Sequence, residues 1–173
     1  TYMSDSADSL SSCCRLRNEI QDNGFSYTLG AGGVSTGSKS VLTINLNRLI
    51  QDAVRHGEDY LEQLADVTDL VHRVQLAYNE NLKRLLDKGM LPLFTAGYIN
   101  IARQYLTVGV NALVEAAESL GIAISDNAEY RHFVKGVLGV IERYNKQYRT
   151  KDVLFNCEMI PAENVGVKHA RWD

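Results

Sequence analysis

The stretch QYLTVGVNALVEAA, residues 104–117, holds a strand pattern followed directly by a helix pattern. Its first half alternates between apolar and polar or small side chains: Leu106, Thr107, Val108, Gly109 and Val110. Neighbouring residues of a strand point to opposite faces, so this strand has one apolar face and one that carries Thr107 and Gly109. The apolar residues that follow predict a helix that ends near Gly121, and a strand joined to a helix is the unit of an α/β fold.

Two other segments show the same two-faced alternation, VLTINLNRL at 41–49 and VLFNCEMI at 153–160. Thr43 and Asn45 share the polar face of the first, and Asn156 and Glu158 share that of the second. Long helical patterns separate the strands, which predicts parallel pairing in an α/β unit. A parallel sheet covered on both faces would be apolar throughout. The polar face is therefore either the ligand-holding interior of a barrel or the open side of a sheet in water.

Two long helices are predicted between the strands. The first extends from about Glu58 to Lys88 and has an apolar side at Tyr60, Leu64, Val67, Val71, Val74, Tyr78, Leu82 and Leu85. The second begins at a capping box formed by Asp126 and Glu129.

The composition favours one soluble domain or part of a larger one. The chain has 173 residues, 45% of them hydrophobic, and 18 basic against 21 acidic residues give a net charge of −3. This balance indicates neither a nucleic-acid partner nor a membrane surface, and no run of apolar residues is long enough for a transmembrane helix. Three cysteines make no disulfide framework, so a reducing cytoplasm is predicted.

Residues 9–40 are predicted to be a long loop that ends in the glycine-rich stretch GAGGVSTGSKS, residues 30–40. A phosphate-binding P-loop needs a lysine after the last glycine, and Ser38 stands there instead. Backbone N–H groups of this stretch, around Ser35 and Thr36, could still bind a phosphate or a neighbouring loop. A loop that packs on its own protein is an equally good interpretation.

Cys13 and Cys14 are adjacent in the polar stretch SLSSCCRLRNE, residues 9–19. Adjacent Cα atoms lie only about 3.8 Å apart, too close for an unstrained disulfide. The four histidines form no ligand pattern with these cysteines, so no metal site is predicted. A reactive thiol remains, whereas Cys157 lies on the helix-facing side of its strand and is predicted to be an ordinary buried thiol.

Four stretches in order, SLSSCCRLRNE, VSTGSKSVLTINLNRL, QYLTVGVNALVEAA and FNCEMIPAENVGVK, resemble the class III anaerobic ribonucleoside-triphosphate reductases, which are glycyl radical enzymes. The resemblance implies a ten-stranded α/β barrel whose finger loop carries a cysteine that becomes a thiyl radical. Cys14 matches that cysteine, with Cys13 as the alternative. The thiyl radical would remove the 3′ hydrogen of the ribose and later return it.

The resemblance also assigns roles to the polar face. Loss of the 2′ hydroxyl as water needs groups that donate and accept protons, and Asn156 and Glu158 are the candidates. The residues expected to contact the ribonucleoside triphosphate substrate are Thr43, Asn45, Gly109, Ser35 and Thr36. Glu158 leaves open whether the reductant is formate or a thioredoxin-type protein.

Further expectations follow from the resemblance. The glycyl radical and a zinc site would lie outside this segment, and an activase containing S-adenosylmethionine and an iron–sulfur cluster would generate the radical. Deoxynucleotides and ATP would act as effectors of a homodimeric cytoplasmic enzyme in an anaerobic bacterium or a phage-infected host.

The whole chain, 1–173, is thus expected to be a central segment of the catalytic barrel, with the finger and glycine-rich loops at 9–40 and the strands and helices at 41–173. Alone it is expected to be inactive. The alternative is a noncatalytic nucleotide-binding or dimerisation module derived from that fold, in which the helix from Glu58 to Lys88 forms the interface.

Overall fold

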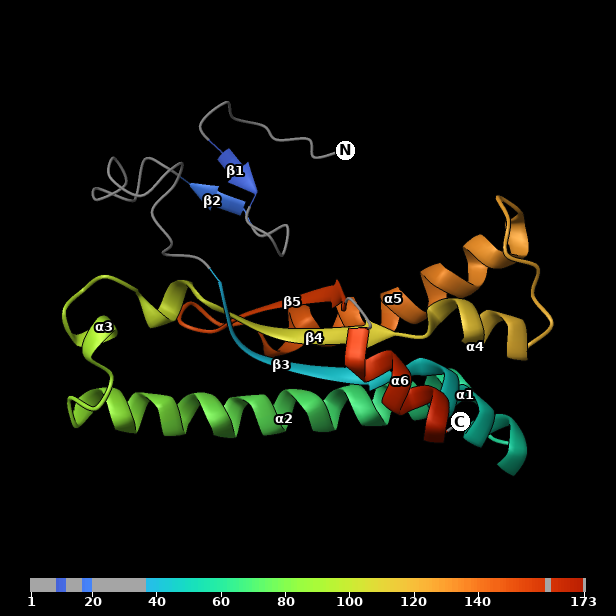
Figure 1. Cartoon of the computed structure of the whole chain (residues 1–173), viewed down its shortest axis with the longest axis horizontal. Helices are drawn as coiled ribbons and strands as arrows, with labels where there is room; N and C mark the ends of the chain where they lie inside the picture. The colour runs from blue at the N-terminus through green and yellow to red at the C-terminus, as the bar shows by residue number, and fades with distance from the viewer. Residues whose placement is uncertain (1–8, 12–16, 20–36, 161–162, 173) are drawn as a thin grey trace.

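The computed structural model describes residues 9–11, 17–19, 37–160 and 163–172. Its centre is a parallel sheet of three strands in the order β3 (Ser38–Asn45), β4 (Tyr105–Asn111) and β5 (Leu154–Met159) (Figure 1). Parallel neighbours require crossover connections, and these are long and helical here. The predicted α/β class, the three strands and their parallel pairing are confirmed.

The register of the sheet brings the predicted polar faces together. Thr43 pairs with Gly109, and Gly109 pairs with Glu158 on its other side. Two residues closer to the amino ends of β4 and β5, Thr107 pairs with Asn156. Since side chains alternate along each strand, one face of the sheet carries Thr43, Asn45, Thr107, Gly109, Asn111, Asn156 and Glu158.

Four helices build one core with the opposite, apolar face. They are α1 (Leu46–His56), α2 (Tyr60–Asp87), α4 (Leu113–Ser119) and α5 (Ala128–Tyr148). Val108 and Val110 from the sheet are fully buried with Leu64 of α2 and Ile141 of α5. Short helices α3 (Pro92–Thr95) and η2 (Ile101–Arg103) lie in the connection from α2 to β4 (Figure 1).

The buried side of α2 is more polar than the apolar pattern predicted. A stripe of four polar residues has 0% exposure: Thr68, His72, Gln75 and Asn79. Val74 and Tyr78, which were expected on the apolar side, are 48% and 43% exposed. Two of the four residues hydrogen-bond to other elements: Gln75 donates to the carbonyl oxygen of Thr107 at 2.7 Å, and the His72 ring hydrogen-bonds to Asn145 of α5 at 2.9 Å. Among the described residues, the side chains of Thr68 and Asn79 have no hydrogen-bond partner. Buried polar groups that find partners replace the expected hydrophobic contacts.

The strand predicted at 41–49 ends earlier, because Asn45 caps a helix. Its side-chain oxygen accepts the backbone N–H of Arg48 at 3.2 Å, and α1 begins at Leu46. Asn47, which alternation placed on the polar face of the strand, therefore lies in α1 and is buried. An asparagine cap of this kind satisfies one of the free N–H groups of the first helical turn.

Other predicted boundaries also shift. The cap of α5 is Asn127, which accepts the N–H of Tyr130 at 2.7 Å, and Asp126 instead pairs with Arg131. The segment predicted as loop at 9–40 contains two short antiparallel strands, β1 (Ser9–Ser11) and β2 (Arg17–Glu19), and its last residues belong to β3. A last helix, α6 (Glu163–Trp172), follows β5 and was not predicted.

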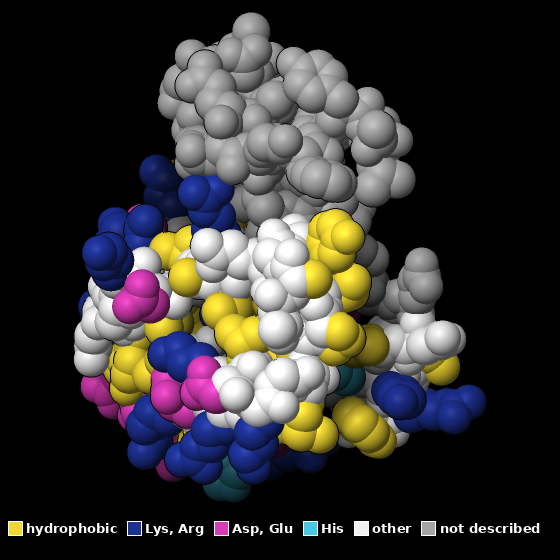
Figure 2. Space-filling model, turned by 90° about the vertical axis from the view of Figure 1, so that its left-hand side faces the viewer, with side chains coloured by type: hydrophobic (Ala, Val, Ile, Leu, Met, Phe, Trp, Pro, Cys, Tyr) yellow, Lys and Arg dark blue, Asp and Glu magenta, His cyan; other side chains and the backbone are white. Residues whose placement is uncertain are grey.

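The connection after α2 carries exposed apolar side chains. Met90, Leu93 and Tyr98 are 57–63% exposed, and Figure 2, which views this end of the molecule, shows apolar surface among basic side chains. Within the described ranges, none of the helices combines the length and apolar character needed to span a membrane.

Candidate functional site

A continuous row of hydrogen bonds crosses the polar face of all three strands. The Ser38 and Thr107 hydroxyls lie 2.7 Å apart, and Thr107 donates to Asn156 Oδ1 at 2.7 Å. Asn156 Nδ2 in turn donates to Glu158 Oε1 at 2.9 Å. We refer to Ser38, Thr107, Asn156 and Glu158 as the cross-strand relay. The two predicted catalytic residues of β5 are thus in direct contact.

The two ends of the Asn156 amide give the cross-strand relay its direction. The N–H end donates to Glu158 Oε1, and the carbonyl oxygen accepts from Thr107. The single Thr107 proton then goes to Asn156, and the Thr107 oxygen is left to accept from Ser38. Ser38 also lies 2.9 Å from the carbonyl oxygen of Ser40, a second acceptor for the same hydroxyl.

Gly109 lies beside Thr43 and Glu158 in the centre of this face, and its backbone is closely covered. A Cβ atom at this position would lie 2.6 Å from both Ile160 Cγ1 and Thr43 Oγ1. Such a separation is far below a normal contact, so only glycine fits without a shift of its neighbours. Gly109 therefore leaves room on this face of β4 for the side chains of Thr43 in β3 and of Ile160, which follows β5.

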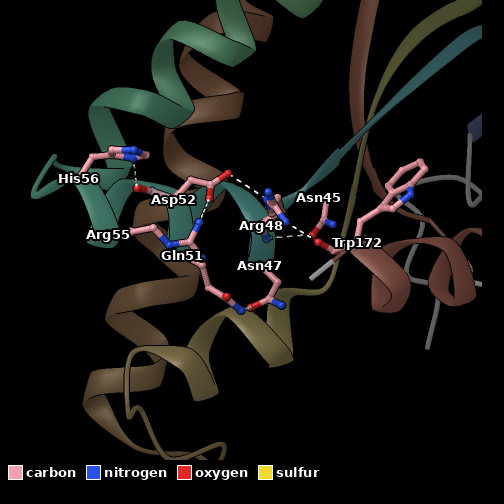
Figure 3. A network of polar contacts seen from close by, with 8 residues as sticks. All are labelled: Asn45, Asn47, Arg48, Gln51, Asp52, Arg55, His56 and Trp172. Atoms are coloured by element: carbon pink, nitrogen blue, oxygen red, sulfur yellow. Dashed lines mark hydrogen bonds and ion pairs between the residues drawn. The ribbon is translucent and has the colours of Figure 1, made fainter.

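Asn45 lies at the carboxyl end of β3, where its side chain caps α1 (Figure 3). Next to it, Arg48 pairs with Asp52 at 3.0 Å and donates to the carbonyl oxygen of Trp172. These contacts tie the end of α6 to the start of α1 at the carboxyl edge of the sheet. Asn45 thus caps α1, in addition to the substrate contact predicted for it.

Two residues of β4 on this face were absent from the predicted site. Thr107 is fully buried and forms the middle of the cross-strand relay. Asn111 is 4% exposed and pairs in register with Asn45, and its side-chain oxygen has no hydrogen-bond partner among the residues that the structure describes. Strand alternation places both residues on the same face as Gly109, so the sequence pattern could have identified them as part of the site.

The cysteines of the predicted finger loop and the predicted phosphate contacts lie outside the described residues: Cys13, Cys14, Ser35 and Thr36. The antiparallel strands β1 and β2 flank the five residues 12–16 that include both cysteines.

Beyond the polar face, two other kinds of site are relevant to the described residues, a pocket and a metal centre. A hollow of about 500 Å³ lies at the connection from α4 to α5, lined by Ile124, Tyr130 and Val134 among others, and no residue of the polar face lines it. Within the ranges that the structure covers, no three His, Cys, Asp or Glu side chains come together in a way that could hold a metal ion.

Cys157 is a partly buried thiol on the helix-facing side of β5, and it packs against the main core. Burial, with a smaller effect from the Glu158 charge, raises its pKa from 9.0 to about 11. Because the folded-state pKa is raised, the neutral thiol stabilises the fold below pH 9, and this contribution is lost as the pH rises toward 11.

We expect iodoacetamide to alkylate Cys157 about 100-fold more slowly at pH 8 than an unperturbed thiol, because only the thiolate reacts. The rate should rise about tenfold per pH unit up to pH 10. Mass spectrometry of the peptide that contains Cys157 measures both, with the guanidinium-unfolded chain as the control. A rate that levels off below pH 9 would contradict the raised pKa.

The comparisons with known proteins agree on one family. The family model described as anaerobic ribonucleoside-triphosphate reductase matches residues 1–173. A solved anaerobic ribonucleotide reductase is 30% identical with a TM-score of 0.78, over 98% of this chain and 27% of its own. The Thermotoga maritima enzyme with citrate in its active site is 31% identical with a TM-score of 0.71, over 79% of this chain and 26% of its own.

A further T. maritima structure, in complex with dATP and CTP, is 30% identical with a TM-score of 0.67, over 73% of this chain and 23% of its own. No curated protein matches the chain. The chain therefore spans about a quarter of the length of these solved relatives. With a family model that matches every residue and a parallel sheet shared with the solved enzymes, the chain belongs to the anaerobic ribonucleoside-triphosphate reductase family.

Proposed function

We propose that this chain forms a segment of the catalytic barrel of an anaerobic ribonucleotide reductase, which reduces ribonucleoside triphosphates to deoxyribonucleotides. In this proposal Cys14, or Cys13 in the alternative register, exchanges a hydrogen atom with the ribose. Asn156 and Glu158 handle the protons of the ribose hydroxyls. The observation that carries the proposal is the Asn156–Glu158 hydrogen bond on the polar face of a sheet that belongs to this family.

The position of Glu158 supports a role in proton transfer. Its Oε1 atom is held by Asn156 Nδ2, and the carboxylate is only partly buried, so it is accessible from the polar face. A carboxylate held in this way can accept a proton from a ribose hydroxyl and return it to the departing 2′ oxygen, which leaves as water. The structural alternative, a carboxylate that only stabilises the end of β5, predicts no effect on the rate.

The proposed ligands follow from the family. A solved relative from T. maritima holds dATP and CTP, which supports a ribonucleotide substrate and a deoxynucleotide effector for this protein as well. Thr43 and Asn45 lie on the same face as Glu158, which supports a substrate contact there. For Gly109, whose backbone is covered by Thr43 and Ile160, the proposal rests on its place between Thr43 and Glu158 in the register. For Ser35 and Thr36 the proposal rests on the sequence.

The remaining parts of the proposed enzyme lie outside this segment. A glycyl radical, generated by an activase with S-adenosylmethionine and an iron–sulfur cluster, would supply the oxidising equivalent for the cysteine, and formate or a thioredoxin-type protein would supply the electrons. A zinc site, a homodimer and regulation by ATP belong to the same proposal, as does a cytoplasmic location. The exposed Met90, Leu93 and Tyr98 support further protein contacts at that end of the segment.

The test is Glu158→Gln in the complete reductase that contains this segment. Glutamine keeps the shape but cannot accept a proton, so we expect kcat for nucleotide reduction to fall about 10²- to 10⁴-fold. The glycyl radical, measured by electron paramagnetic resonance, should persist at the wild-type level.

Glu142→Gln on the exposed side of α5 is the matched control, because Glu142 forms a surface ion pair with Lys146, away from the polar face of the sheet. It should leave kcat unchanged. A Glu158→Gln enzyme with wild-type kcat would remove Glu158 from the chemistry.

A further inference from the structure

We propose that Thr107 is a positioning residue for the reaction, which acts by fixing Asn156 and Glu158 through the cross-strand relay, in which the Ser38 hydroxyl lies 2.7 Å from that of Thr107. The inference rests on the proposed function of Asn156 and Glu158. It assigns a role to the side chain of a residue in β4, the central strand, of which only Gly109 was among the predicted site residues.

The first argument is geometric. An asparagine amide can rotate by half a turn with almost no change in shape, and only its partners decide which end faces Glu158. Thr107 Oγ1 lies 2.7 Å from Asn156 Oδ1 and can offer a proton to it. That bond holds the N–H group of Asn156 toward Glu158, where it lies 2.9 Å from Oε1.

The second argument is burial. Thr107 has 0% exposure, while Asn156 and Glu158 are partly exposed, so water can reach the outer residues but cannot replace the Thr107 hydroxyl. The Thr107 backbone is held as well, since its carbonyl oxygen accepts from Gln75 of α2. A buried hydroxyl on a strand that is fixed from the helix layer provides a rigid support for a reactive pair.

The third argument is the composition of the polar face. Isoleucine or valine at position 107 would suit the β propensity of a central strand at least as well as threonine. The buried Thr107 hydroxyl is hydrogen-bonded on both sides, by Ser38 and Asn156, whereas a valine or isoleucine would leave both without this partner.

The experiment compares Thr107→Val with Thr107→Ser in the complete, activated reductase. Valine keeps the shape but removes the hydroxyl, so Asn156 Oδ1 loses its donor and the amide is no longer fixed from the side of β4. We expect kcat to fall about 10- to 100-fold with little change in KM, and serine to restore most of it. Thr68→Val is the matched control, since the buried Thr68 hydroxyl of α2 has no hydrogen-bond partner within the described part of the chain. It should leave kcat unchanged.

A double variant tests whether Thr107 acts through Glu158. In a Glu158→Gln background, Thr107→Val should cause no further loss of kcat, because the group that it positions is already gone. Thermal midpoints confirm that each variant folds. Ser38→Ala, at the partly buried end of the cross-strand relay, should lower kcat by a few-fold and gives a second test should Thr107→Val not fold.

The outcomes separate this inference from the proposed function. Wild-type kcat in Glu158→Gln overturns the proposed role of Glu158. Loss in Glu158→Gln with wild-type kcat in both Thr107→Val and Ser38→Ala overturns the cross-strand relay alone. Equal losses in Thr107→Val and Thr107→Ser, or the same loss from Thr107→Val in both backgrounds, would also overturn it, since the hydroxyl would then not act through Glu158.

Discussion

Replacement of Cys14 by serine in the complete reductase is expected to abolish deoxynucleotide formation while the glycyl radical stays at its wild-type level. The stored radical would still form, but no thiol would remain through which it could reach the substrate. A serine hydroxyl is much harder to oxidise than a thiol, so the substitution removes the chemistry and changes little in shape. The measurements are nucleotide reduction and the radical signal on the same sample.

Cys13→Ser distinguishes the two adjacent thiols. It should cost far less than Cys14→Ser, because Cys13 is expected to affect only the packing of the loop. Loss of reduction in Cys13→Ser with activity in Cys14→Ser would move the radical to Cys13 and leave the mechanism unchanged. Activity in both variants would contradict the finger-loop interpretation of residues 9–19.

Gly109→Ala is expected to have the largest effect on stability. The new Cβ atom would lie 2.6 Å from Ile160 Cγ1 and from Thr43 Oγ1, one on each side of β4. Overpacking of this kind costs about 1–3 kcal/mol, and valine at the same position should cost more. Urea unfolding measures the loss as a lower midpoint with an unchanged slope.

Gly139→Ala is the matched control for this experiment. Gly139 lies in the middle of α5 and is exposed, with no atom within 4 Å of the new Cβ. Alanine should therefore stabilise the helix by about 0.5–1 kcal/mol. A Gly109→Ala protein as stable as the wild type would show that Ile160 or Thr43 can move aside at little cost.

Alternation was enough to place the polar face correctly. Thr43, Gly109 and Glu158 share a face because each occupies the right parity in its own strand, and parity is a local property. The register that makes them direct neighbours was not available from the sequence. It depends on pairing between residues far apart in the sequence, since Gly109 follows Thr43 by 66 positions and precedes Glu158 by 49, and the intervening helices decide that pairing.

Local patterns gave wrong predictions in two situations. In one, a single residue belongs to a strand and also caps a helix; in the other, a residue far along the chain supplies the hydrogen bond that allows a polar side chain to be buried. Asn45 continues the alternation of β3 and also caps α1, so the strand pattern extended past the true boundary. On α2, hydrophobicity favoured Val74 and Tyr78 for the buried side. Gln75 is buried instead because the Thr107 carbonyl oxygen, 32 positions along the chain, accepts its N–H.

The buried polar residues of α2 favour one position of this helix along its own axis. Leucines in place of these residues would find similar neighbours after a slide of one turn, about 5.4 Å. With the stripe in place, such a slide would separate Gln75 from the Thr107 carbonyl oxygen and His72 from Asn145 at the same time. Both losses would leave polar groups buried without partners. Each shifted packing of α2 would therefore lose two hydrogen bonds at once, which raises its free energy above that of the native packing. The two hydrogen bonds thus fix the position of α2 along its axis relative to β4 and α5.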